Sequence, residues 1–122
     1  MNYTQEEKEK FLLFKVTADK LDATISTEVK AAVSNAINQG HKNIIMDMSQ
    51  VKYCDSSGLN VILIGYRGCK NANGSFILFG TSKMVSKLIH MSQLNTILSI
   101  VETESEAIDL LYMEEIERDI NN

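Results

Sequence analysis

Metal-ligating and disulfide-forming side chains are scarce in this sequence of 122 residues, which has two cysteines and two histidines. His41 and His90 lie far apart, and neither has a Cys or His at the spacing that zinc sites use, so we expect no metal site. Nothing in the sequence suggests export, and a cysteine pair inside the cell stays reduced. We therefore expect Cys54 and Cys69 to be small side chains of the core and not a disulfide.

Long apolar runs are also absent. No stretch approaches the roughly 18 apolar residues that a membrane helix needs, and the first ten residues, MNYTQEEKEK, lack the apolar stretch of a signal peptide. We expect a cytoplasmic protein that has no membrane partner.

Positive charge is too sparse for a nucleic-acid binder. The chain has 12 basic and 16 acidic residues, a formal net charge of −4 and no basic patch, so we expect no direct contact with nucleic acid. Neither Gly-x-Gly-x-x-Gly nor Gly-x-x-x-x-Gly-Lys occurs, and the sequence carries no cofactor signature. What is present is an ordinary globular composition, 44% hydrophobic, at a length that suits one domain over residues 1–122.

Apolar periodicity predicts an α/β fold, a sheet of about five strands with about four helices packed on it. Short runs of branched and aromatic residues predict strands over 11–17, 43–48, 75–80 and 97–101, after a poorly ordered edge strand or turn in residues 1–10. Apolar positions at three- and four-residue spacing predict helices over 24–39, from the serines at 56 and 57, from the cap Ser82, and after a capping box from Thr103 to Glu106. The acidic tail 113–122 is expected to be frayed and solvated.

One segment, Asp55-Ser56-Ser57-Gly58, stands between a predicted strand and a predicted helix. Such turns favour ligand and chemical sites because a helix start presents unpaired amides and the positive end of the dipole. A simpler interpretation is that Asp55 or one of the serines only caps the helix, which contributes about 1 kcal/mol. Two adjacent hydroxyls are more than one cap requires, so the second is free to project outward.

The sequence as a whole resembles the STAS family, and within it the small anti-anti-sigma factors of bacteria. The resemblance runs from about Phe11 to Leu111, and it implies a single STAS-like domain with a mixed sheet. It is carried by Asp55-Ser56-Ser57-Gly58-Leu59 followed by Val61-Ile62-Leu63, by Lys20-Leu21-Asp22, and by Lys87-Leu88-Ile89-x-Met91-Ser92-x-Leu94.

This resemblance implies a phosphorylation switch at Ser56, with Ser57 as the alternative acceptor and otherwise the helix cap. A partner that is both anti-sigma factor and serine kinase would phosphorylate Ser56, and a phosphatase of the PP2C type would reverse the reaction. The unphosphorylated protein would bind the anti-sigma factor and free the sigma factor. Asp22 would help to orient the serine, and Asp55 and Gly58 would support the site.

Three residues depart from the family pattern. Ala18 and Lys20 stand where relatives usually carry Gly and Glu, and Asn60 replaces a common Gly. Lys20 reverses a charge close to the expected binding surface, which bears on the identity of the partner.

The helix after the motif has a second apolar side. A core stripe of Leu59, Ile62, Leu63 and Tyr66 leaves Val61, Ile64, Gly65 and Gly68 on roughly the opposite side. That side is either buried under a neighbouring element or a docking surface, and Val61→Asp would separate the two. For docking we expect the partner to contact Leu59, Asn60, Val61 and Ile64.

Three classes of function follow from these observations. The first is a regulatory binding protein, not an enzyme, that is controlled by serine phosphorylation. The second is a STAS scaffold or adaptor subunit of a stress-sensing or lipid-transport complex. The third, an enzyme with Ser56 as nucleophile, needs a general base, and His41 and His90 are the histidines available, in no recognisable triad context. The sequence does not indicate an oligomeric state.

Overall fold

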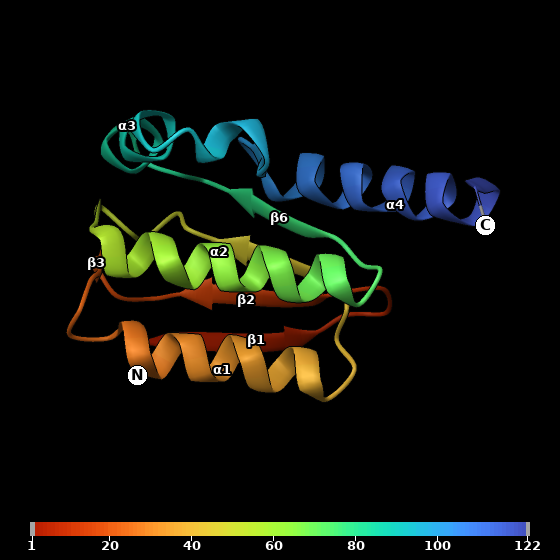
Figure 1. Cartoon of the computed structure of the whole chain (residues 1–122), viewed down its shortest axis with the longest axis horizontal. Helices are drawn as coiled ribbons and strands as arrows, with labels where there is room; N and C mark the ends of the chain where they lie inside the picture. The colour runs from red at the N-terminus through yellow and green to blue at the C-terminus, as the bar shows by residue number, and fades with distance from the viewer. Residues whose placement is uncertain (1, 122) are drawn as a thin grey trace.

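A five-stranded mixed sheet lies at the centre of the computed structural model, which describes residues 2–121 (Figure 1). The strand order is β1-β2-β4-β6-β7; β1 runs antiparallel to β2, and every other neighbouring pair is parallel. The strands are β1 (Tyr3–Glu7), β2 (Leu12–Val16), β4 (Ile44–Asp47), β6 (Phe76–Phe79) and β7 (Ser99–Val101). The remaining elements are β3 (Lys20–Leu21), β5 (Tyr53–Cys54), α1 (Ser26–Asn38), α2 (Ser56–Asn71), α3 (Lys83–Met91), the short 3-10 helix η1 (Leu94–Thr96) and α4 (Glu104–Asn121).

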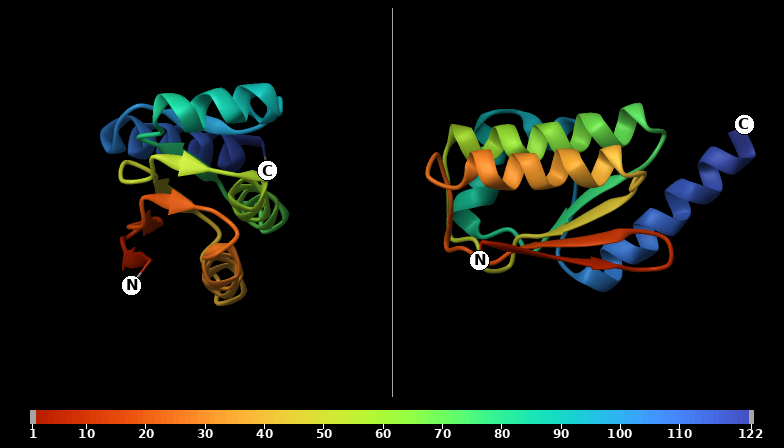
Figure 2. Two further views of the ribbon diagram at one scale, coloured as in Figure 1. Left: turned by 90° about the vertical axis from the view of Figure 1, so that its left-hand side faces the viewer. Right: turned by 90° about the horizontal axis from the view of Figure 1, so that it is seen from below.

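Helices cover both faces of this sheet (Figure 2). Alternate residues of β4 and β6 point to opposite faces, as the two-residue period of a strand requires. Ile44 and Met46 join the larger core, which α1, α2 and α3 cover. Ile45 and Ile77 join a smaller core under α4. The predicted α/β fold is confirmed, including the four predicted strands, which are β2, β4, β6 and β7, and all four predicted helices.

The two-residue strands β3 and β5 form a separate parallel ribbon that the sequence does not predict. Two residues are too few for a periodic pattern to appear. Residues 3–7, for which the sequence predicts a weak edge strand or a turn, form β1 at the edge of the sheet. The helix caps agree with prediction, because Ser82 accepts from the Val85 amide at 3.1 Å and Thr103 accepts from the Glu106 amide at 3.1 Å.

The tail 113–122, expected to be frayed, corrects an expectation: residues 113–121 form the second half of α4, and residue 122 lies outside the described residues. A polar network attaches it to the start of β4 and β6. Asn43 and Ser75, 4% and 3% exposed, accept hydrogen bonds from Arg118, at 3.5 Å and 2.9 Å. Ser75 also donates to Glu114 at 2.6 Å, and Asn43 donates to Glu115 at 3.1 Å. Satisfied hydrogen bonds to buried groups stabilise the docked helix.

Among residues 2–121, no helix combines the length and the apolar character that crossing a bilayer requires.

Candidate functional site

The ribbon of β3 and β5 places two carboxylates side by side at the start of α2. Leu21 pairs with Cys54 in the parallel register, so the next residues, Asp22 and Asp55, follow neighbouring strands at the same edge. Ser56 comes directly after Asp55 and is the first residue of α2. The structure therefore places Asp22, Asp55 and Ser56 at the same edge, an arrangement consistent with what the family resemblance implies.

Asp55 is the cap of α2. Its Oδ1 accepts from the Gly58 amide at 3.1 Å, and its Oδ2 accepts from the Ala23 amide at 3.3 Å. The expectation that Ser57 caps the helix is therefore wrong, because the preceding carboxylate already occupies that role. One carboxylate joins the helix start to the loop after β3, 32 residues earlier in the chain.

This arrangement leaves both serine hydroxyls unused. Within the described part of the chain, neither Ser56 nor Ser57 uses its hydroxyl in a hydrogen bond to another residue. Ser56 is exposed, whereas Ser57 is half-buried. At the first turn of a helix the backbone amides and the dipole favour negative charge nearby. Ser56 is thus an accessible hydroxyl at a position that tolerates an added anion.

Gly58 permits the close approach of the ribbon to α2. A Cβ at this position would overlap the carbonyl oxygen of Leu21 and would lie 2.5 Å from the Cys54 Sγ. The Leu21 carbonyl belongs to the backbone at the end of β3, so it cannot move aside without breaking the ribbon. Gly58 therefore supports the site through its lack of a side chain.

Asp22 is held by its own loop. Its Oδ1 accepts from the Thr24 hydroxyl at 2.6 Å and from the Thr24 amide at 3.0 Å. The Thr24 hydroxyl is the main cause that lowers the pKa of Asp22, with nearby Lys20 as a lesser contribution. Its side-chain hydrogen bonds go to Thr24 and not to Ser56, so Asp22 shapes the neighbourhood of the serine through the loop. Sequence reasoning missed Thr24, although an Asp-x-Thr pattern is typical of such a turn.

The face of α2 next to Ser56 is partly apolar and partly polar. Asn60 is exposed and Ile64 is half-buried, so both are accessible, one and two turns after Ser56. Leu59, at 9% exposed, lies at the margin of the core. Leu63, expected to belong to the core stripe, is half-buried.

Val61 corrects the expectation of a direct partner contact, because its side chain is 0% exposed and belongs to the larger core. The glycines on the same side are close-packing positions. A Cβ at Gly65 would lie 2.5 Å from the ring of Phe76 in β6, and one at Gly68 would overlap Ile37 of α1. On the second apolar side of α2, Val61 and Gly65 are therefore buried and Gly68 packs against α1, whereas Ile64 stays half-buried.

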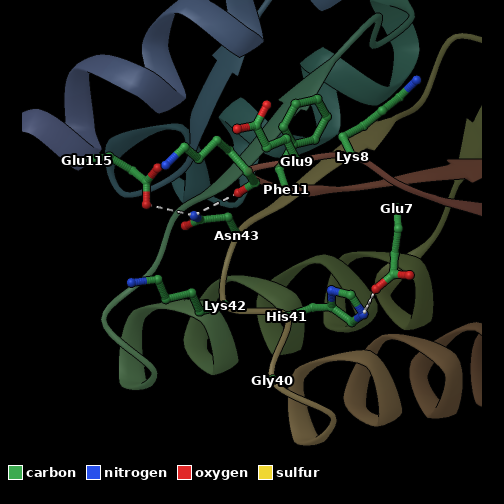
Figure 3. Close-up of a pocket in the computed structure, with 10 residues that line it drawn as sticks. Glu7, Lys8, Glu9, Phe11, Gly40, His41, Lys42, Asn43 and Glu115 are labelled. Carbon is green, nitrogen blue, oxygen red and sulfur yellow. Dashed lines mark hydrogen bonds and ion pairs between the residues drawn. The ribbon is translucent and has the colours of Figure 1, made fainter.

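Cys69 and both histidines lie outside this arrangement of hydroxyl and carboxylates, and Cys54, which directly precedes Asp55, is buried. Burial is the main cause that raises the pKa of Cys54 and of Cys69, each to about 12, so both thiols stay protonated near neutral pH. His41 lies before β4, at the end of the sheet remote from Ser56, where its Nε2 is 3.2 Å from the Glu7 carboxylate (Figure 3). His90 is an exposed residue in the last turn of α3.

We predict that Asp55→Ala lowers the free energy of unfolding by about 1–2 kcal/mol, since it removes a helix cap. The Ala23 amide also loses its partner. Asp55→Asn keeps an acceptor for the Gly58 amide and should lose less than half as much. Urea unfolding followed by circular dichroism measures both. An alanine variant as stable as the wild type would contradict the capping role of Asp55.

Comparison with known proteins identifies the family of this chain. Residues 2–107 match the family model described as STAS domain. The chain is 29% identical over 91 residues to an anti-sigma-B factor antagonist of Listeria monocytogenes, a match that covers 73% of this chain and 78% of the relative.

Solved structures share the fold. The anti-sigma factor antagonist SpoIIAA in its unphosphorylated form has a TM-score of 0.76 at 28% identity, covering 90% of this chain and 96% of the other. The phosphorylated form of SpoIIAA, from Bacillus, has a TM-score of 0.69 at the same 28% identity, covering 88% of this chain and 96% of that one. A STAS domain protein from Planctomyces limnophilus has a TM-score of 0.82 at 14% identity, covering 90% and 97%, which is a likeness of fold alone. With the family model matching most of its length and the Asp-Ser-Ser-Gly turn at the start of α2, this chain belongs to the STAS domain family.

Proposed function

We propose that this protein is an anti-sigma factor antagonist controlled by phosphorylation of Ser56. In the proposal, the unphosphorylated form binds an anti-sigma factor that is also a serine kinase, and so frees a sigma factor in the cytoplasm. The observation that carries the proposal is the exposed Ser56 hydroxyl, left unused at a helix start that Asp55 already caps. Similarity to an anti-sigma-B factor antagonist and to SpoIIAA supports it.

The proposed reaction transfers the γ-phosphoryl group of ATP to Ser56. The Ser56 Oγ attacks the γ-phosphorus of ATP, ADP leaves, and the hydroxyl proton goes to a base. Asp55 accepts two amide hydrogen bonds and Asp22 accepts two from Thr24, and neither carboxylate accepts a hydrogen bond from the Ser56 hydroxyl. We therefore assign the base to the kinase. A PP2C-type phosphatase would restore the hydroxyl by hydrolysis.

The consequence of phosphorylation is expected to be local. A phosphate adds about −1.5 to −2 charge, and the start of α2 stabilises that charge instead of unfolding around it. The same charge beside Asp22 and Asp55 would stand in the surface formed by Ser56, Asn60 and Ile64, which is the surface we propose for docking. The partner is then released by charge and bulk at the interface and not by refolding.

We predict that a host serine kinase of this type, with ATP and magnesium, phosphorylates the wild type and Ser57→Ala but not Ser56→Ala. Intact-mass and peptide mass spectrometry measure the added phosphate and its position. The two alanine variants carry the same substitution at adjacent positions of one turn. Loss of phosphorylation in Ser56→Ala alone therefore identifies Ser56 as the acceptor. Phosphate that persists on Ser56→Ala would refute the site, and a chain that no such kinase modifies would favour the scaffold or adaptor function.

A further inference from the structure

The outward face of α4 carries an apolar stripe that no other element among residues 2–121 covers. Four of its residues, at three- and four-residue spacing, lie on one side of the helix. Their exposed fractions are Tyr112 42%, Met113 58%, Ile116 58% and Ile120 76%. In Figures 1 and 2, the second half of α4 extends past the end of the sheet, away from the start of α2.

The polar network on the opposite side of α4 fixes this stripe in its outward orientation. Glu114, Glu115 and Arg118 all bond to Asn43 or Ser75 at the base of the sheet. Rotation of the helix about its axis would break these bonds and leave the hydroxyl of the buried Ser75 without a partner, which is costly. The stripe is therefore held in place, and a partner would not need to order it.

The charged residues of α4 that flank the stripe are acidic. Asp109 lies at its start, and Glu117 and Asp119 flank it on either side; all three are exposed. Arg118 is the only basic residue in the sequence of α4, and it points inward to Ser75. An acidic rim around an apolar stripe is complementary to a segment with apolar residues and basic flanks.

A groove of about 370 Å³ lies alongside the stripe, between α4 and the turn that joins β1 to β2. It is lined by Glu9, Lys10, Tyr112, Glu115, Ile116 and Asp119. Apolar anchors from a partner could enter here beside Ile116. Three of these six lining residues are acidic and one, Lys10, is basic, so the groove continues the net negative charge of the rim.

We propose that the outward face of α4 and this groove bind an amphipathic helical segment of another protein, with aliphatic residues on one side and Lys or Arg along its flanks. A second copy of this chain would bring the acidic rims together, and an anionic membrane surface would repel them. The site lies at the opposite end of the sheet from Ser56, so both surfaces can be occupied at once. This inference does not depend on the proposed function.

The test uses a synthetic helical peptide of leucines at three- and four-residue spacing flanked by lysines, and a control peptide with glutamate for lysine. Isothermal titration measures the affinity of each for the full chain, and amide chemical shifts locate binding on the wild type. We expect the basic peptide to bind, to shift amides in residues 109–120, and to bind at least about tenfold less tightly to the double variant Ile116→Gln, Ile120→Gln.

The double variant Met84→Gln, Met91→Gln is the matched control, because it removes exposed apolar side chains from α3 instead. It should bind the basic peptide within about twofold of the wild type, well under the loss that one hot-spot contact causes. Three results would overturn the proposal: equal weakening in both double variants, shifts confined to other elements, or self-association of the free chain that Ile116→Gln, Ile120→Gln abolishes. The last would assign the stripe to a second copy.

Discussion

Val61→Asp should lower the free energy of unfolding by about 4 kcal/mol or more, because it places a carboxylate in the core without a partner. Val61 is 0% exposed and belongs to the larger core. Typical domains are stable by only about 5–15 kcal/mol, so much of the protein should be unfolded. Urea unfolding at neutral pH measures the loss.

The matched control is Asn60→Asp, which introduces the same side chain one residue earlier on the exposed face. It should change the free energy of unfolding by less than about 0.5 kcal/mol, as surface substitutions usually do. If Val61→Asp were as stable as Asn60→Asp, the conclusion that α2 packs between α1 and the sheet would be contradicted.

Ser56→Glu should weaken binding of the anti-sigma factor by about 30-fold or more, which corresponds to about 2 kcal/mol. The added carboxylate would stand beside Asp22 and Asp55, so the surface would carry three negative charges where the partner docks. Surface plasmon resonance with the immobilised anti-sigma factor measures the affinity.

Ser56→Gln separates charge from bulk, because it adds the same volume without the charge. We expect a smaller loss than for Ser56→Glu. Equal losses would assign the effect to bulk, and wild-type affinity in both variants would remove Ser56 from the interface. Similar amide chemical shifts in the three proteins away from residue 56 would support release without refolding.

Much of the fold was predictable because its elements have strong local patterns. The buried strands β4 and β6 are continuous apolar runs, and α1 has apolar residues at helical spacing with Gly40 after it. The ribbon of β3 and β5 was not predictable, because its order comes from pairing between segments 33 residues apart.

The candidate site was likewise predictable only in part. The Asp-Ser-Ser-Gly turn identified the helix start, but the choice of Asp55 over Ser57 as cap depends on backbone geometry. Apolar spacing in α2 could not distinguish a second buried side from a docking face. That distinction needs Phe76 and Ile37, the neighbours that Gly65 and Gly68 approach, and both are remote in sequence.

The structure of the tail of α4 could not be predicted from its composition. Its acidic residues suggested solvated chain, yet two of them, Glu114 and Glu115, bond to Ser75 and Asn43. The pairings join residues 39 and 72 apart, and no local pattern signals them.

The hydrogen bond from the Ala23 amide to Asp55 joins the loop after β3 to the start of α2. A newly synthesised chain carries Ser56 from the moment that residue leaves the ribosome, but it has the surrounding surface only after this long-range closure. A partner that contacts both the loop and the helix start would therefore bind the folded protein and not a nascent or damaged chain. Under the proposed function, the amount of sigma factor released would then depend on the concentration of folded protein.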